Sequence, residues 1–115
     1  MFISHIDTME KKSLEGESLS KVIKQTAVGP EQGWEDYVMR VFTVGPGGHT
    51  PKHAHPWPHI NYVLEGSGTL FHGGAESQIG TGSIAYVPEG TEHQFRNTGP
   101  DNLVFICIVP EEGDK

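Results

Sequence analysis

Residues 48–59 read Gly-His-Thr-Pro-Lys-His-Ala-His-Pro-Trp-Pro-His, which brings His53, His55 and His59 close together in the sequence. A fourth histidine, His93, follows the turn signal Pro-Glu-Gly at residues 88–90. Neutral imidazole is the commonest protein ligand for metal ions near neutral pH, because a ring nitrogen offers its lone pair. Four of the seven histidines therefore fall in two short Gly- and Pro-framed blocks, which predicts a metal site built across several strands.

Strand geometry explains how these histidines could converge. Side chains on a strand alternate between its faces, so His53 and His55 are expected to point the same way. The Pro-Trp-Pro run at 56–58 forces a bend that returns His59 beside them, and His93 completes the set from a neighbouring strand. A His-x-His pair alone could arise by chance, and the remaining histidines (His5, His49 and His72) are expected to be packed or solvated.

Length and composition predict a single all-β domain. The chain has 115 residues with 15 Gly and 8 Pro, and its apolar runs are short. Roughly eight to ten strands separated by turns indicate an all-β sandwich or barrel. Residues 1–20 are expected to form an N-terminal arm, with a surface loop or a short helix over 8–20, and residues 21–115 the single barrel domain. Strands are expected at 21–26, 37–43, 60–64, 69–71, 77–79, 83–87, 93–96 and 103–109, with a turn at 45–48.

Charge and cysteine content narrow the partners. A net charge of −7 without a basic block argues against nucleic acid and anionic membranes as partners. A small molecule is therefore the expected ligand. The single cysteine, Cys107, excludes an internal disulfide and is compatible with a reducing cytosol. No signal peptide is evident, and no apolar run approaches the ~20 residues of a membrane span. These features predict a cytoplasmic protein.

The two histidine blocks resemble the paired motifs of the cupin superfamily, over about residues 37–110. The first block matches at Gly47, His53, His55, His59 and Gly66. The second block matches at Gly82, Pro88, Gly90, His93 and Asn97. The resemblance implies a double-stranded β-helix (cupin/jelly-roll) barrel with a metal ion inside it, and a homodimer whose sheets extend across the interface.

The sequence departs from many cupins at one ligand position. Where those proteins carry a glutamate, this chain has His59, so the implied ligands are four neutral imidazoles. In this respect the chain is similar to the small single-domain four-histidine cupins that hold manganese and support oxidative cleavage of carbon–carbon double bonds. Four histidines leave two positions of an octahedron open for substrate, water or oxygen. Imidazole ligands also suit Fe, Ni, Zn or Cu, and only the resemblance places Mn first.

Several further residues are candidates for the substrate pocket. The resemblance places Phe105, Cys107 and Val109 toward the metal, because they share one face of the last strand. Cys107 is either a small buried side chain or an oxidisable thiol. Arg40 is either at the rim or directed inward, where it could hold an anionic substrate and contribute to catalysis. The remaining pocket candidates are Trp57 and Phe95, for which packing roles are the alternative.

Three functions remain open from the sequence. The first is a metal-dependent oxidoreductase that activates oxygen or a peroxide, in a dioxygenase-like reaction on a small organic molecule. The second is a metal-dependent isomerase or sugar-processing enzyme, although cupins of that type usually retain a Glu or Gln ligand. The third is a non-catalytic module that binds a small molecule, because no catalytic acid or base is evident beyond Asp36, Glu65, Glu89 and Glu92, which are expected on the surface.

Overall fold

The chain folds into one antiparallel sheet of nine strands, which confirms the predicted all-β class. The structure is a computed structural model and describes residues 1–114. Within these residues the helices are short 3-10 turns, and none is long and apolar enough to span a membrane. The strands are β1 (Lys12–Leu14), β2 (Ser20–Val28), β3 (Tyr37–His49), β4 (His59–Glu65), β5 (Ser67–His72), β6 (Ala75–Gly80), β7 (Ile84–Val87), β8 (His93–Arg96) and β9 (Leu103–Pro110). The 3-10 turns are η1 (Ile6–Thr8), η2 (Pro30–Gln32) and η3 (Glu111–Asp114).

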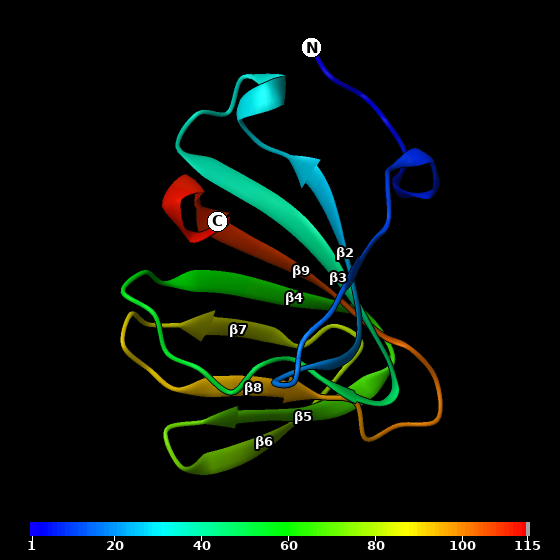
Figure 1. Ribbon diagram of the computed structural model, residues 1–115, viewed down its shortest axis with the longest axis vertical. Coiled ribbons are helices and arrows are strands. Elements are labelled where there is room, and N and C mark those ends of the chain that lie inside the picture. The colour runs from blue at the N-terminus through cyan, green and yellow to red at the C-terminus, as the bar shows by residue number, and fades with distance from the viewer. Residues whose placement is uncertain (115) are drawn as a thin grey trace.

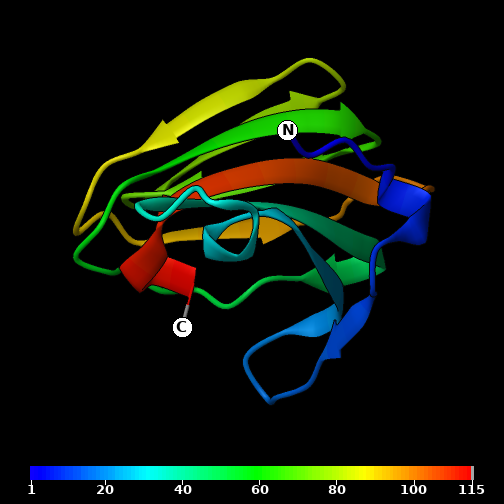
Figure 2. The same ribbon diagram turned by 90° about the horizontal axis from the view of Figure 1, so that it is seen from above.

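The strand order creates a curled sheet that surrounds an interior. Neighbouring strands follow the order β6-β5-β8-β3-β9-β4-β7, and β2 adds to β3 and carries β1 on its other side. Figure 1 shows β9, β4 and β7 side by side, with the C-terminal η3 close to the end of β9. Figure 2 shows η3 (red) at one end of the curled sheet. One face of the sheet therefore lines the interior in which the site residues lie.

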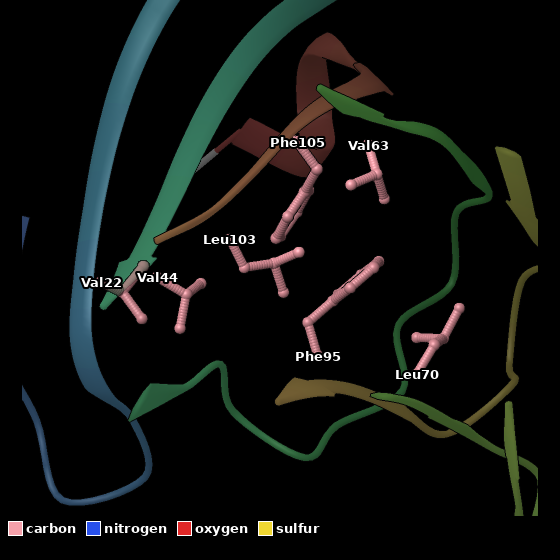
Figure 3. Close-up of a cluster of buried hydrophobic side chains, with 7 residues drawn as sticks. All are labelled: Val22, Val44, Val63, Leu70, Phe95, Leu103 and Phe105. Carbon is pink, nitrogen blue, oxygen red and sulfur yellow. The ribbon is translucent and has the colours of Figure 1, made fainter. Parts of the chain in front are cut away.

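Seven buried apolar side chains form the core at one end of this interior. Figure 3 shows them pointing toward one another from different strands. The rings of Phe95 and Phe105 stack at 4.2 Å between centroids, and Phe42 lies 5.6 Å from Phe105. Inward residues alternate with outward ones along β9, as expected for a strand with one buried face. The core residues are Val22, Val44, Val63, Leu70, Phe95, Leu103 and Phe105.

The predicted turn at 45–48 is wrong, because β3 runs through it to His49. Gly47 has a φ of +79°, which glycine adopts without the steric cost that other residues incur. The register against β2 shifts at this point. Residues 37–44 pair with β9, whereas His49 pairs with Arg96 of β8, so the bend lets β3 pair with β8 as well as with β9 and β2.

The loop or helix predicted over 8–20 is also only partly correct. Residues Lys12–Leu14 form β1 and pair antiparallel with β2. Part of the N-terminal arm therefore joins the sheet. Asn97, which belongs to the second motif, has a structural role: its side-chain amide donates to the carbonyl oxygens of Val44 and Asp101, at 2.8 Å each, and holds the loop before β9.

Candidate metal centre

The four motif histidines come from two chain segments that hydrogen-bond to each other. His53 and His93 form an isolated antiparallel bridge, with N–H to O distances of 3.1 and 2.9 Å. The backbone N–H of Gly90 donates to the carbonyl of His55 at 2.9 Å. Gly90 has a φ of +77°, so glycine suits this turn of the second motif. His59 begins β4, and His93 begins β8.

The expectation that His53 and His55 lie on one regular strand is wrong. The segment between β3 and β4 is irregular apart from the bridge at His53. The Pro residues at 51, 56 and 58 lack the N–H groups that a strand ladder needs. The bridge to His93, and not strand alternation, therefore positions these two side chains.

The structure brings all four imidazole rings together. Candidate ligand nitrogens of His53, His55 and His93 lie within 4.8 Å of one another, so these three could bind one metal ion. Nε2 of His59 lies 3.1 Å from Nε2 of His93. Ring centroids of His59 and His55 are 5.5 Å apart. The other histidines (His5, His49 and His72) make separate local contacts, as expected.

Hydrogen bonds hold three of the rings with Nε2 free. Nδ1 of His93 lies 2.9 Å from the carbonyl oxygen of Thr91, and Nδ1 of His55 lies 3.4 Å from that of Trp57. A carbonyl oxygen only accepts, so each Nδ1 carries the hydrogen. Nδ1 of His59 lies 2.7 Å from Oδ1 of Asn61, whose amide nitrogen donates to the carbonyl of Ile106. In the neutral ring, the lone pair then lies on Nε2.

This tautomer pattern fits a shared cation. Two Nε2 atoms that both carry lone pairs cannot hydrogen-bond to each other, yet those of His59 and His93 face one another at 3.1 Å. Nitrogens at adjacent octahedral positions lie about 3 Å apart when each is about 2.1 Å from an ion. In protein metal sites, the ring nitrogen that does not bind the ion commonly donates a hydrogen bond that orients the ring, as Nδ1 does here. The donor set therefore suits a divalent transition metal.

The histidines are also held in the form that can bind a metal. Burial, followed by repulsion from His93, lowers the pKa of His53 and of His59 to about 4. Burial likewise lowers the pKa of His55 and of His93. All four rings are therefore neutral at pH 7, with lone pairs available.

A cavity of about 590 Å³ adjoins the four rings, a volume typical of a small-molecule site. Three of the predicted pocket residues, Trp57, Phe95 and Phe105, line it. The ring of Trp57 stacks on His55 with 4.9 Å between centroids. Val109 is buried on the same face of β9 as Cys107 but is not among the residues that line this cavity. The four acids expected on the surface are exposed.

Arg40 and Cys107 lie together on adjacent strands and both line the cavity. Nη2 of Arg40 donates to Sγ of Cys107 at 3.0 Å, and Arg40 is directed inward, not at the rim. Burial raises the pKa of the Cys107 thiol, although the Arg40 charge opposes this effect. The thiolate is the reactive form of cysteine, so this environment favours Cys107 as a buried side chain over a reactive thiol.

Sequence reasoning missed three residues of the site. Asn61 is 1% exposed and lies two positions after His59 on the same strand face, so strand alternation could have identified it. Lys24 lines the cavity two positions after the buried Val22, on the strand β2 that was predicted. Asp114 of η3 also reaches the cavity, but no pattern near the chain's end signals this.

Comparison with known proteins identifies the family. The family model described as a cupin domain matches residues 40–109. The polyketide cyclase RemF from Streptomyces resistomycificus has a similar structure, with a TM-score of 0.89 and 27% identity over 96% of this chain and 79% of that chain. This likeness assigns the curled sheet to the double-stranded β-helix barrel fold.

Two curated relatives differ from each other in activity. One is the 1-methylthio-D-xylulose 5-phosphate methylsulfurylase of Rhodospirillum rubrum, 36% identical over 77 residues, or 67% of this chain and 49% of the relative. Another is the dimethylsulfoniopropionate lyase DddW of Ruegeria pomeroyi, 34% identical over 77 residues, or 67% of this chain and 50% of the relative. The chain spans about half the length of these relatives, so the likeness covers the barrel and not the whole of either protein.

Proposed function

This chain belongs to the cupin family, and from that premise we propose that it is a metal-dependent oxidoreductase that activates oxygen or a peroxide and transforms a small organic molecule. The observation that carries the proposal is the set of four neutral imidazoles whose free nitrogens converge beside a cavity of about 590 Å³. A set without a carboxylate leaves the positive charge of an ion undiminished, which favours the binding of anionic and reduced oxygen species.

The proposed ligands are His53, His55, His59 and His93, with one ion per chain. We place manganese first, then iron, with nickel, zinc and copper as the other candidates. When bound, the ion would supply Lewis acidity and, if it is redox-active, electron transfer. The protein's part is to orient the rings through their Nδ1 hydrogen bonds and to place an apolar cavity beside them.

The cavity lining favours oxidative chemistry over proton transfer. Abstraction of a proton next to a carbonyl needs a positioned general base. Among the described residues, Asp114 is the single carboxylate that lines the cavity, and it is engaged in ion pairs with Lys24 and Arg40. The histidines, if they bind the ion, are not available as bases. An isomerase would therefore lack a free general base in this cavity.

Elemental analysis of the purified protein, with His59→Ala as the comparison, tests the proposal. We expect a stoichiometric amount of manganese or iron in the parent protein, a reduced amount in the variant, and oxygen or peroxide consumption that chelation abolishes. The absence of any metal in both proteins, even after reconstitution, would contradict the metal site. Tight metal binding without turnover of any oxidant would support the metal site but refute the proposed oxidoreductase activity.

A metal-dependent sugar-processing enzyme is the second candidate. The observation in its favour is the relative whose name specifies a xylulose phosphate, together with the cationic Lys24 and Arg40 beside the cavity. Lewis-acid chemistry of this kind should survive replacement of the native ion by zinc, whereas oxygen or peroxide activation should not. A non-catalytic binding module would instead show ligand-dependent thermal stabilisation without turnover.

We also propose that the chain forms a homodimer through the outer face of β4 and β7. Four large apolar residues there are 44–73% exposed, and they oppose each other in register as Ile60–Tyr86 and Tyr62–Ile84. Exposed apolar patches of this kind are typical of interfaces. Among the described strands, β7 pairs only with β4, so its other edge is available to a second copy. The patch and the edge are adjacent, which suits a two-fold symmetric contact that extends the sheet.

A further inference from the structure

Positive charge is concentrated at one side of the cavity. Lys12, Lys24 and Arg40 line it, which is three of the chain's eight Lys and Arg residues. Of the fifteen acidic residues, all within the described part of the chain, Asp114 alone lines it. A cleft with one sign of charge in a protein of net charge −7 raises the local concentration of anions. This distribution indicates an anionic ligand.

Asp114 already binds to these cations as a carboxylate. Its Oδ1 lies 2.7 Å from Nζ of Lys24 and 3.6 Å from Nη1 of Arg40. The side chains of Lys24, Arg40 and Asp114 are only 17%, 13% and 22% exposed, so the contact is largely shielded from solvent. A buried guanidinium needs a negatively charged partner, because an uncompensated buried charge is strongly destabilising. The protein therefore shows which chemical group the cations accept.

The fit of Asp114 to Arg40 is incomplete. At 3.6 Å its oxygen is beyond hydrogen-bond distance of Nη1, and the buried Nε of Arg40 has no hydrogen-bond partner among the described residues. Guanidinium binds carboxylates best through two parallel N–H···O bonds. A carboxylate that can approach Nε directly would use a donor that Asp114 leaves unused.

The segment that carries Asp114 is a short turn that follows β9 directly. The 3-10 turn η3 has four residues, and none of them is buried. Among the described residues, a backbone hydrogen bond ties it to the barrel, from the N–H of Glu111 to the carbonyl of Asp36, at 2.9 Å. Figure 2 shows the turn at the end of the curled sheet. An added side chain at Gly113 would clash with Val109 and Trp57, so the turn packs closely against them. A ligand that displaces Asp114 therefore has to replace its ion pairs with Lys24 and Arg40.

The rest of the cavity indicates the body of the ligand. Four aromatic side chains line it together with the cations and the histidines: Phe42, Trp57, Phe95 and Phe105. The guanidinium of Arg40 lies 5.0 Å above the ring of Phe42, so the charged and aromatic parts are in contact. Flat apolar groups pack well against such walls.

We propose that Lys24 and Arg40 form a binding site for the carboxylate of a small aromatic acid, and that Asp114 occupies this site as an internal carboxylate that the ligand displaces. Small aromatic acids would then be the substrate class of the proposed metal-dependent activity. Binding of the acid does not depend on that proposed function; only its later reaction does. The metal site would hold the reacting part of the molecule, and the cation pair would fix its orientation.

Benzoate and its neutral counterpart benzamide test the proposal by calorimetric titration, in metal-loaded protein and after treatment with EDTA. In Asp114→Asn, benzoate should bind about tenfold more tightly, as expected if the cations are free about one-tenth of the time in the parent protein. Benzamide should be unaffected. Glu112→Gln, an exposed acid of the same turn, removes the same charge and should leave both affinities unchanged. Lys24→Met and Arg40→Gln should weaken benzoate binding alone.

Several outcomes would overturn the inference. Unchanged or weaker benzoate binding in Asp114→Asn, with a lower thermal midpoint, would mean that Asp114 only fastens the turn to the barrel. Equal tightening of benzoate and benzamide would mean that the change merely opens the cavity. If benzoate binding is lost when the metal is removed but is unchanged in Lys24→Met, the carboxylate binds the ion and not the cations. Failure of the metal site itself would appear in elemental analysis, whereas the charge-dependent effects in EDTA-treated protein would persist.

Discussion

Replacement of Asn61 by leucine separates the orientation of a metal ligand from the stability of the barrel. Asn61 is 1% exposed; its Oδ1 accepts from Nδ1 of His59 at 2.7 Å, and its amide donates to the carbonyl of Ile106 at 3.3 Å. Leucine has a similar size but offers neither partner. His59 would lose the hydrogen bond that keeps its lone pair on Nε2, so the affinity for manganese or zinc should fall by about 10- to 100-fold.

The same change should also destabilise the metal-free protein by about 2 kcal/mol, because a buried N–H and a buried carbonyl are left without partners. Asn61→Asp provides the matched comparison. It retains an acceptor for His59 but removes the donor to Ile106, so it should lose stability while it keeps the metal affinity. Competition with a fluorescent chelator measures the affinity, and guanidinium unfolding in EDTA measures the stability.

The pair of variants can refute the reasoning in two ways. If Asn61→Leu loses stability but binds metal as the parent protein does, then the hydrogen bond to His59 does not govern a ligand. If Asn61→Asp loses as much metal affinity as Asn61→Leu, the effect comes from general disruption of β4 and not from the acceptor. His59→Ala sets the lower limit of affinity in both comparisons.

Three further predictions concern the core, the histidines and the outer face. Phe105→Ala should destabilise the protein by about 3–5 kcal/mol in chemical unfolding, because its 2% exposed ring stacks on Phe95, whereas Val104→Ala on the opposite face should cost much less. His59 has its folded pKa lowered to about 4, so the unfolded state binds the proton more strongly and acid favours unfolding. In the metal-free protein, His59 alone should therefore account for a loss of roughly 3 kcal/mol as the pH falls from about 6.5 to 4, and His59→Leu should remove this share of the loss in pH-dependent unfolding. Ile84→Glu, at a residue 73% exposed on the proposed interface, should shift the mass measured by light scattering from dimer to monomer, while a dimer that persists would exclude this face.

Much of the strand pattern could be predicted, because strand alternation and turn residues are local signals. β9 shows this most clearly, since its buried and less buried residues alternate as its sequence predicts. The turn predicted at 45–48 failed for a non-local reason. Gly and Pro residues usually end strands, but here the chain continues as β3 and bends to pair His49 with β8. Which partner a bent strand meets depends on the whole sheet and not on the residues at the bend.

The histidines of the site could be predicted more fully than their surroundings. Their convergence was expected from spacing, although the bridge between His53 and His93, and not a regular strand, brings the two segments together. Strand alternation could have predicted that Asn61 lies beside His59, where its Oδ1 accepts the hydrogen bond from Nδ1 of His59. The ion pair of Asp114 with Lys24 was not, because it joins residues far apart in the sequence through a short turn with no pattern of its own.

The two sides of the cavity depend on different physical terms and should therefore respond differently to their surroundings. The imidazoles are neutral, and short hydrogen bonds to Thr91 and Asn61 orient them, so dissolved salt has little direct effect on their geometry. The contact between Asp114 and Lys24 is an ion pair near the end of the barrel, and screening weakens it. Salt that loosens this ion pair also competes with an incoming carboxylate for the same cations. The affinity for an acid should thus fall less steeply with ionic strength in the parent protein than in Asp114→Asn, where only the competition remains.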